Sequence, residues 1–527
     1  MSHEAFQQAI FQEPDDDALR LIYADWLDEN GESLWAELIR TQCELATSTP
    51  SSNRFVDLQE RVIELRHRLA NHPTIPKPET PRDTLWESSF IDLGLRRGFL
   101  TSMYLMNDSW VAVPIDRAQR LCDRLESFVD QFPLDSFRIL DFGVEPSTMI
   151  MDRSFMSSVR ELRFSRTWWR AHPLPPGTNP NIQVESVCRH SRFSRLQTLE
   201  LDAPIDDQGL TMLANASNLQ KLESLKINPA SATQQGWEEF AYSPLAAQLT
   251  ALEIPSAYLT PEAVQGLTSD VWPRLHTLKL TRTGLSTSAI ETLAQSDAFP
   301  NLTSLWIEHD PLEPASIQAL EKNRTWNLRE LRLEGCELRS RSIQLLASSP
   351  FVQHLHTLSL RNNRIGIQGM TALIKSRQLK KLRRLDLSFN PLEGRQFRSL
   401  TRGNLLMQLS TLQLRQFNYA SPVGSMSQGK LLMDSWELPS IRHLDLSGLR
   451  LGASGAKAMA KKTWASSIRI LELCQAMIHD SGARALLEVL DPAELAWITL
   501  AEDKIAETTQ AELRERFGSE RVSFEVT

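Results

Sequence analysis

The apolar pattern L-x-x-L-x-L returns at nearly constant intervals between residues 159 and 500. Its central positions are Leu162, Leu199, Leu225, Leu252, Leu278, Leu305, Leu331, Leu358, Leu385, Leu412, Leu444, Leu471 and Ile498. From Leu199 onward the intervals are 26 or 27 residues, except for one interval of 32. A fixed period of this length indicates stacked supersecondary units, none of which can bury its apolar face alone. The pattern therefore predicts one continuous solenoid.

Each unit of the repeat combines a strand with a helix. Alternate apolar residues of L-x-x-L-x-L point into the core and the residues between them face outward, which is the two-residue period of a strand. A helical stretch follows, as at residues 260–267, where Thr260 precedes Pro261 as a hydroxyl cap before a first-turn proline. Parallel strands stack about 4.8 Å apart whereas packed helices need about 8 to 10 Å, so the helical side must be longer. The predicted fold class is α/β: a right-handed, horseshoe-shaped solenoid with a parallel concave sheet and helices on the convex side.

The residues before the repeats predict a small all-α N-terminal domain. Residues 1–46 contain three short amphipathic stretches, and a fourth runs from Phe55 to Leu69. Gly31 follows the second stretch, at a place where a left-handed residue ends a helix. Four prolines between residues 71 and 81 predict an extended linker. The predicted domains are a helical region over residues 1–72, a proline-rich linker over 73–82, degenerate capping repeats over 83–158 and the solenoid over 159–527.

The N-terminal region carries a family resemblance. Residues 15–31, DDDALRLIYADWLDENG, followed by AELIRTQCELA at residues 36–46, resemble the repeat-companion domain found at the N-termini of bacterial repeat proteins. Arg97-Gly98-Phe99 resembles an element that members of this family place between the companion domain and the repeats. The resemblance implies a repeat architecture and implies no activity.

The repeat itself resembles the leucine-rich repeat family, of the helix-containing intracellular type typified by ribonuclease inhibitor and by the GTPase-activating protein for Ran. Cys336, Asn363 and Asn390 fall at the family's asparagine-or-cysteine position, where a polar side chain ties down loop backbone. Pro204 and Ala476 leave that position without such a side chain. Because these solenoids serve as inhibitors, receptors, scaffolds and regulators, the resemblance implies a fold rather than a function.

Charge is unevenly distributed along the chain. The net charge is −8, and residues 1–46 alone hold eleven acidic residues against Arg20 and Arg40, so the rest of the chain is close to neutral. Two interpretations stay open: an acidic helical surface that keeps the domain soluble, or an electrostatic docking face for a basic partner or for the chain's own solenoid. The net negative charge argues against a nucleic-acid partner.

The cysteines and the apolar stretches of the sequence indicate the cellular compartment in which the protein is expected. The five cysteines are odd in number and show no C-x-x-C spacing, so neither a disulfide framework nor a zinc site is indicated. The N-terminus does not resemble a secretory signal, and no apolar stretch reaches the roughly 18 residues of a membrane span. We therefore expect a cytoplasmic protein without a membrane partner.

The residues that follow the central leucines form a column across the predicted sheet. From Arg163 to Lys279, positive and negative residues alternate in successive repeats, which predicts cross-strand charge pairs. Beyond Arg332 the column becomes acidic, and Trp306 stands at the junction. A tryptophan there is either a binding anchor or a ring lying flat on its neighbours. We predict that the main partner contact on the concave face comprises Trp306, Glu308, Arg332, Arg361, Asp386 and Asp445.

The sequence offers little catalytic chemistry. No phosphate-binding loop, zinc-protease helix or nucleophile-elbow motif occurs. His443 and Cys474 fall on adjacent predicted strands but four residues out of register, about 13 Å apart, which excludes a catalytic dyad. His354 and His356 have a spacing that suits a metal ion, but no third ligand is evident. We therefore predict no catalytic residue, no metal and no cofactor.

Three functional hypotheses remain. The favoured one is a non-catalytic scaffold that binds a protein partner on the concave face. The alternative is a GTPase-activating regulator resembling the Ran activator, acting from a rim loop such as Arg361-Asn362-Asn363-Arg364. The third is recognition of a small ligand or carbohydrate in the concavity. The sequence predicts neither the identity of the partner nor the oligomeric state.

Overall fold

The chain forms two compact units in the computed structural model. One comprises Met1–Ser48 and Pro76–Leu302, and the other comprises Thr49–Ile75 and Thr303–Thr527. The structure describes residues 2–12, 16–48, 53–69, 89–96, 99–107, 135–140, 144–165, 179–391, 405–416, 433–501, 505–519 and 521–525, with single positions 116, 119, 120, 122, 123, 126 and 400. The predicted linker over 73–82 lies outside these residues.

The first unit begins with three helices, as the sequence predicts. They are α1 (His3–Gln12), α2 (Asp17–Glu29) and α3 (Ser33–Thr47). The carboxylate of Asp16 caps α2 by accepting a hydrogen bond from the amide of Ala18, and Gly31 follows the helix with φ = 86°. His3, Phe6, Tyr23, Trp26 and Trp35 pack their rings together between these helices. The N-terminal domain thus has an aromatic core of its own.

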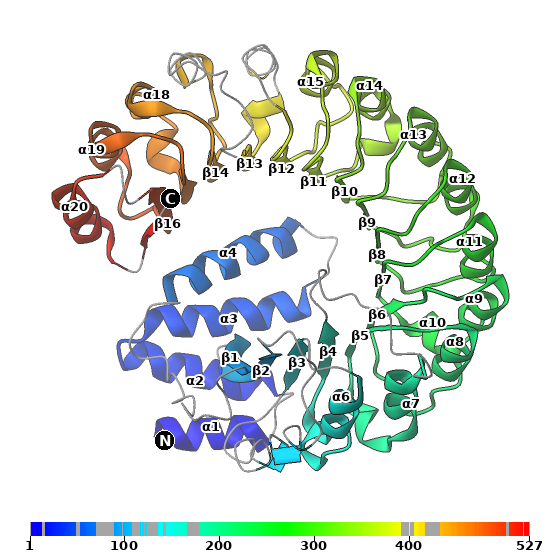
Figure 1. Ribbon diagram of the computed structural model, residues 1–527. Coiled ribbons are helices and arrows are strands. Elements are labelled where there is room, and N and C mark those ends of the chain that lie inside the picture. Colours follow the sequence, from blue (N-terminus) through cyan, green and yellow to red (C-terminus); the bar gives the residue numbers. More distant parts are fainter. Residues whose placement is uncertain are drawn as a thin grey trace. The chain divides into compact units, whose positions relative to one another are not determined.

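A sheet follows these helices in the first unit (Figure 1). Its strands are β1 (Ser89–Arg96), β2 (Phe99–Asn107), β3 (Ser136–Leu140), β4 (Glu161–Ser165), β5 (Thr198–Pro204), β6 (Ser224–Asn228), β7 (Ala251–Pro255) and β8 (Thr277–Thr281). β2 to β8 pair in parallel and in chain order. β1 instead pairs antiparallel with β2, because the two intervening residues are too few for a parallel crossover. The capping segment therefore starts with a hairpin rather than with a further repeat.

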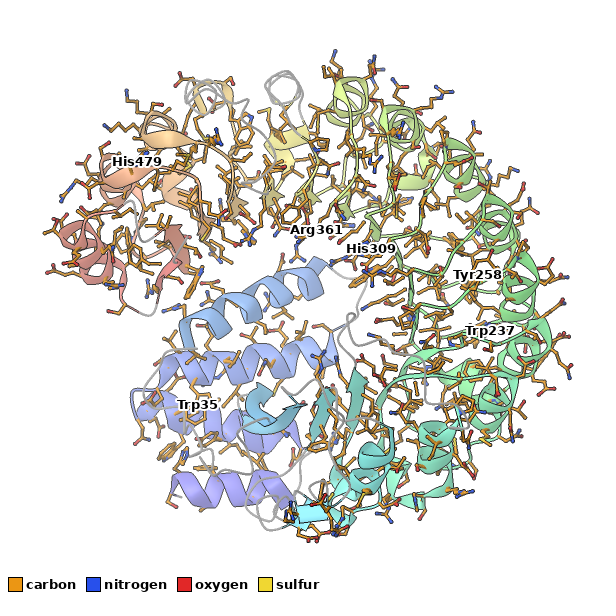
Figure 2. All side chains as sticks on the ribbon, in the orientation of Figure 1. Trp35, Trp237, Tyr258, His309, Arg361 and His479 are labelled. Carbon is orange, nitrogen blue, oxygen red and sulfur yellow. The ribbon has the colours of Figure 1, made fainter. Side chains whose placement is uncertain are left out.

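Helices connect the strands of the first unit. They are α6 (Val144–Met151), α7 (Ile182–Arg189), α8 (Asp207–Ala214), α9 (Gln234–Ala241), α10 (Pro244–Gln248), α11 (Pro261–Leu267) and α12 (Thr287–Gln295). The predicted start of α11 is confirmed: Pro261 occupies its first turn, and the Thr260 hydroxyl accepts a hydrogen bond from the amide of Ala263 at 3.2 Å. Trp237 of α9 is fully buried, on the helical side of the unit (Figure 2).

The second unit continues the same strand-and-helix alternation. Its strands are β9 (Ser304–Glu308), β10 (Glu330–Glu334), β11 (Thr357–Ser359), β12 (Arg384–Asp386), β13 (Thr411–Gln413), β14 (His443–Asp445), β15 (Ile470–Glu472), β16 (Trp497–Ala501) and β17 (Val522–Glu525), all paired in parallel. Its helices are α4 (Asn53–Leu69), α13 (Pro314–Leu320), α14 (Ser340–Ser348), α15 (Ile367–Ile374), α18 (Gly452–Met459), α19 (His479–Val489) and α20 (Glu507–Phe517). Apart from α4, these helices lie on the outer side of the strands (Figure 1).

The repeat leucines form the core of both units. Each central residue from Leu162 to Ile498 is at most 1% exposed. Within each unit the parallel register pairs the central residues of neighbouring repeats directly, for example Leu331 with Leu358 and Leu358 with Leu385. The predicted fold class, a solenoid with a parallel inner sheet and outer helices after a helical N-terminal region, is therefore confirmed.

A residue in the left-handed backbone region follows many of the strands. Ser256, His309, Asn362 and Phe389 each lie four residues after a central leucine and have φ between 55° and 60°. This region favours glycine, and Gly335 and Gly448 occupy the equivalent place in other repeats. Such a conformation costs about 1 kcal/mol or more in a residue other than glycine, so the turn must be held by other contacts.

The asparagine-or-cysteine position supplies those contacts. The amide nitrogen of Asn363 donates to the carbonyls of Leu333 at 2.6 Å and Leu360 at 2.9 Å, and its oxygen accepts from the amide of Leu338 at 2.9 Å. Asn390 makes equivalent bonds one repeat later, and the Cys336 thiol donates to the carbonyl of Ile307. The predicted backbone-tying role of these three residues is confirmed.

We predict that Asn363→Ala lowers the free energy of unfolding by about 2–4 kcal/mol, because it leaves buried carbonyls and an amide without partners. Asn327→Ala, at an exposed position, is the matched control and should change stability by about 0.5 kcal/mol or less. Chemical denaturation followed by circular dichroism measures both variants. Equal stability of the two variants would contradict the structural role assigned to Asn363.

Candidate functional site

All six residues of the predicted partner contact belong to the second unit. Trp306 and Glu308 lie on β9, Arg332 on β10, Asp386 on β12 and Asp445 on β14, while Arg361 lies two residues beyond the end of the short strand β11. Figure 2 shows Arg361 and His309 on the inner, strand side of this unit. We call the inner surface of β9 to β16 the concave surface.

Trp306 is half-buried beneath an arginine. The guanidinium of Arg332 lies 4.0 Å from the centre of the indole ring, and the indole nitrogen donates to the Ser304 hydroxyl at 2.9 Å. The same guanidinium forms ion pairs with Glu330 at 2.7 Å and Glu334 at 3.7 Å. The Arg332 guanidinium therefore covers a face of the Trp306 ring, and these contacts hold both side chains in orientation.

Arg361 forms a second stack of this kind. Its guanidinium lies 4.3 Å from the centre of the Phe389 ring, which belongs to the next repeat. In the loop that follows, Asn362 is in the left-handed region, Asn363 is buried in its backbone bonds, and Arg364 pairs with Glu337 at 3.6 Å. The rim loop is therefore held by specific contacts along its length.

Asp386 is a half-buried carboxylate between these arginine stacks and the C-terminal strands. It accepts a hydrogen bond from the amide of Ser388 at 2.8 Å. Burial raises the pKa of Asp386, although the Ser388 hydrogen bonds and the positive charge of Arg361 act in the opposite direction. The charged form of Asp386 is therefore less favourable in the folded protein than in water.

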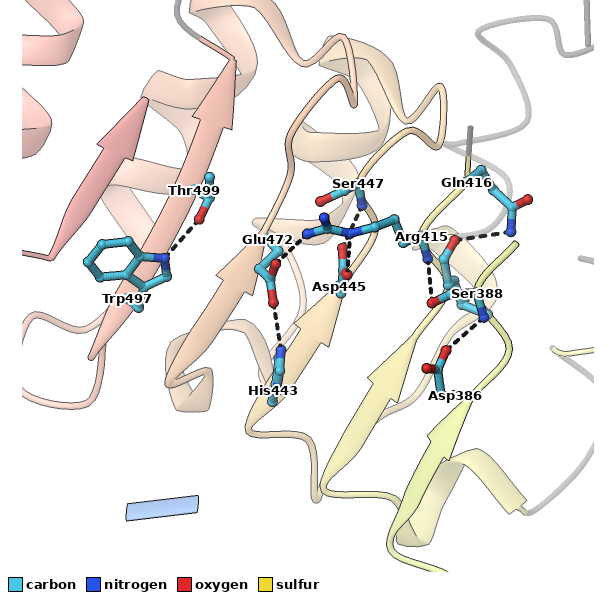
Figure 3. Close-up of polar contacts among 11 residues, drawn as sticks. Asp386, Ser388, Arg415, Gln416, His443, Asp445, Ser447, Glu472, Trp497 and Thr499 are labelled. Atoms are coloured by element: carbon cyan, nitrogen blue, oxygen red, sulfur yellow. Dashed lines mark hydrogen bonds and ion pairs between the residues drawn. The ribbon is translucent and has the colours of Figure 1, made fainter. Parts of the chain in front are cut away.

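Asp445 belongs to a charge network that spans three repeats (Figure 3). Arg415, two residues beyond the end of β13, donates to Asp445 at 3.0 Å and to Glu472 at 2.6 Å. Glu472 also lies 3.0 Å from Nε2 of His443. Asp445 itself is only 3% exposed, so it acts on the surface through the orientation that it gives to Arg415.

The sequence reasoning missed Arg415 as a site residue. Arg415 stands three residues after its central leucine, Leu412, in the same relation as Arg361 to Leu358. In the sequence, Glu472 is one residue of the acidic column beyond Arg332, and His443 is considered only as a possible partner of Cys474. Attention to this second outward column, in addition to the first, would have found Arg415.

His443 and Cys474, which the sequence excludes as a catalytic dyad, have different partners in the structure. The His443 ring contacts Glu472, whereas Cys474 is buried and directs its sulfur to the carbonyl of Leu500. The part of the chain that the structure describes contains no cluster of three or more residues suited to hold a metal ion. No helix within the described ranges has the length and hydropathy needed to cross a membrane.

The first unit carries the alternating charges predicted for its strands. Lys226 lies 2.9 Å from both Glu200 and Glu253, and Lys279 lies 3.7 Å from Glu253. Burial lowers the pKa of Lys226, but the two carboxylates outweigh burial and raise it overall. The prediction of cross-strand pairs is confirmed from Glu200 to Lys279, whereas Arg163 pairs with Glu161 of its own strand at 3.6 Å.

Comparisons with known proteins agree with this repeat architecture. The family model described as Leucine Rich repeat matches residues 353–373, which run from the segment before β11 into α15. The match identifies a leucine-rich repeat within the second unit. A curated relative, the Tonsoku-like protein of Mus musculus, is 28% identical over 199 residues, which are 35% of this chain and 14% of that protein. The chain thus spans only a small part of the length of this relative.

Several solved structures are similar to this chain at low sequence identity. The structure of the Rad7 and Elc1 complex in yeast has a TM-score of 0.40 at 16% identity and covers 75% of this chain and 84% of the matched chain. A protein from Bacteroides fragilis has a TM-score of 0.38 at 14% identity, with 57% and 93% of the two chains covered. InlP of Listeria monocytogenes has a TM-score of 0.24 at 16% identity, with 52% and 67% covered.

The Glu472 network predicts a pH-dependent contribution to stability. Burial raises the pKa of Glu472, but His443 and Arg415 together outweigh it, so that the pKa lies below its usual value. A depressed pKa stabilises the fold above the unfolded-state pKa of about 4.3, and this contribution is lost as pH falls through the folded-state pKa. Glu472→Gln should therefore cost about 1–3 kcal/mol at neutral pH and progressively less in acid. A gap between wild type and variant that stayed constant from neutral to acid pH, in urea denaturation, would contradict this assignment.

Replacing Asp386 should change the free energy of unfolding in the opposite direction. Because its pKa is raised, the carboxylate destabilises the folded protein above its folded-state pKa, and the penalty vanishes once the group is protonated in both states. Asp386→Asn keeps the shape and the acceptor for the Ser388 amide, so the variant should be more stable than wild type at neutral pH and equally stable in acid. Thermal denaturation of wild type and variant from neutral to acid pH measures this stability difference. A variant less stable than wild type at neutral pH would contradict the prediction.

Proposed function

We propose that the protein is a non-catalytic scaffold that binds a protein partner on the concave surface of residues 303–527. The proposed contact is centred on Trp306, Glu308, Arg332, Arg361 and Asp386, with Asp445 positioning Arg415 at its C-terminal side. Arginine and aromatic residues are the side chains most enriched among the dominant contributors to protein–protein affinity.

The observation that carries the proposal is the pair of arginine–aromatic stacks on the first four repeats of the second unit. Arg332 lies on Trp306 and Arg361 lies on Phe389, at 4.0 and 4.3 Å. Each stack fixes the rotamers of two large side chains before any partner arrives, so less conformational entropy is lost on binding. A surface with fixed aromatic and guanidinium groups is suited to recognise a folded or helical protein segment.

The charge of Asp386 supports the same surface. Its burial penalises the charged form, and a group whose charge reduces stability is a candidate for selection by function. Asp386 lies in register between Ser359 and Gln413, within the sheet that also bears the two stacks. In this proposal Asp386 receives a donor group of the partner.

The rim loop gives less support to GTPase activation. Arg364 pairs with Glu337, and Arg361 lies against Phe389, so neither arginine extends alone toward a partner's nucleotide. The location in the cytoplasm, the absence of a nucleic-acid partner and the companion role of residues 1–46 stay predictions of the sequence.

We predict that Trp306→Ala weakens binding of a captured protein partner by about 30-fold or more, because truncation of a central aromatic anchor costs about 2 kcal/mol or more. The measurement is immobilisation of the wild-type chain, isolation of the partner, and titration of the purified partner against each variant.

The matched control is Tyr242→Ala. Tyr242 is an exposed aromatic residue, 60% accessible, that follows α9 in the first unit. This variant should bind the partner as the wild type does, and circular dichroism should show both variants folded. Undiminished affinity of Trp306→Ala, or equal losses in both variants, would end the proposal.

A further inference from the structure

The residues that immediately precede the strands of the second unit form a continuous ladder. The amide of each residue donates to the carbonyl of its equivalent in the preceding repeat, in the order Arg329, His356, Arg383, Ser410, Arg442 and Arg469, with distances of 2.7 or 2.8 Å. Five of these six consecutive residues are arginine or histidine. We call this row, together with Lys381, the basic edge.

Most cations of the basic edge lack a carboxylate partner within the described part of the chain. Among the described residues, no ion pair joins Arg329, Lys381, Arg383 or Arg442 to an acidic group. Lys381 instead lies 3.2 Å from Nδ1 of His354. Parallel strands are about 4.8 Å apart, so the row from Arg329 to Arg469 extends over roughly 24 Å.

The pKa values of His354 and His356 are lowered by the positive charges of this edge. Burial lowers the pKa of His356, and Arg329, Lys381 and Arg383 lower it further. His354 shows the same direction, from burial and then from Lys381 and Arg329. Both rings are therefore disfavoured as cations by uncompensated neighbours of the same sign.

The equivalent ladder of the first unit is not basic. It runs through Arg160, Gln197, Glu223, Thr250 and His276, joined by the same amide-to-carbonyl bonds. Arg160 there pairs with Asp135 at 3.0 Å. The backbone geometry of the repeat therefore does not require positive residues at this position.

One carboxylate already lies at the C-terminal end of the edge. Glu64 of α4 is 6% exposed, and its carboxylate lies 3.8 Å from the guanidinium of Arg469. Arg469 also pairs with Glu494 at 3.4 Å. Arg469, the last arginine of the row, thus forms an ion pair with a carboxylate from α4, a helix outside the repeats.

We propose that the basic edge is a second interaction surface, separate from the concave contact, that binds an acidic segment of a protein. The pattern set by Glu64 and Arg469 favours carboxylates as the ligand groups. The net charge of −8 opposes the long-range attraction of a nucleic acid, which is the competing polyanion. Arg329, Lys381, Arg383 and Arg442 remain available for the partner's acidic side chains.

The test compares the full-length wild type with Arg383→Glu/Arg442→Glu in binding a short labelled poly-glutamate peptide at low salt. The wild type should bind, and the double reversal should weaken binding about tenfold or more, because each lost or reversed contact in water is worth about 1 kcal/mol. Added salt should weaken the wild-type complex by screening. The Arg383→Lys/Arg442→Lys variant keeps the charge and should retain most of the affinity.

The matched control is Arg341→Glu, which reverses an exposed arginine on α14 and should leave peptide binding unchanged. Circular dichroism should show the same fold for all variants. A wild type that does not bind the peptide, or equal losses for Arg341→Glu and the double reversal, would overturn the proposal. A single-stranded oligonucleotide of equal charge serves as the competitor, and its tighter binding, lost in the double reversal, would assign the edge to nucleic acid instead of acidic protein.

Discussion

Burial of the central leucines between neighbouring repeats is the interaction on which the rest of the structure depends. Each of these side chains is removed from water only because the next repeat covers it, and each contributes about 1.5–3 kcal/mol by that burial. The same contact fixes the parallel register, so residues at equivalent places in successive repeats become neighbours. Every column of charge or aromatic side chains on the sheet follows from this register.

The register also explains why the two units differ in character although their backbones repeat. In the first unit the outward column alternates in sign, and Lys226 is held between Glu200 and Glu253. In the second unit the column presents Trp306 and Arg332, then Asp386 and Glu472, and it recruits Arg361 and Arg415 from the positions beyond the strands. The first arrangement neutralises itself, whereas the second leaves oriented side chains that a partner can contact.

The left-handed turns after the strands cost free energy, and hydrogen bonds within the same repeats offset this cost. Residues such as His309 and Phe389 adopt positive φ without being glycine, and the buried amide of Asn363 or Asn390 binds the loop carbonyls beside them. Because this position is set by the period, Arg361 and Phe389 come together at a defined distance. The surface proposed for binding therefore rests on the same bonds that stabilise the fold.

The sequence by itself determined the repeat, the buried leucines, the asparagine contacts and the alternating ion pairs, because a strict period specifies which residues face inward and which residues become neighbours. Only the tertiary structure decided that Arg332 covers Trp306, that Asp445 is buried beneath Arg415, and that α4 groups with residues 303–527. These features depend on side-chain rotamers and on packing between segments far apart in the chain. A one-dimensional pattern carries no information on either, and it likewise gave no sign that β1 pairs antiparallel with β2.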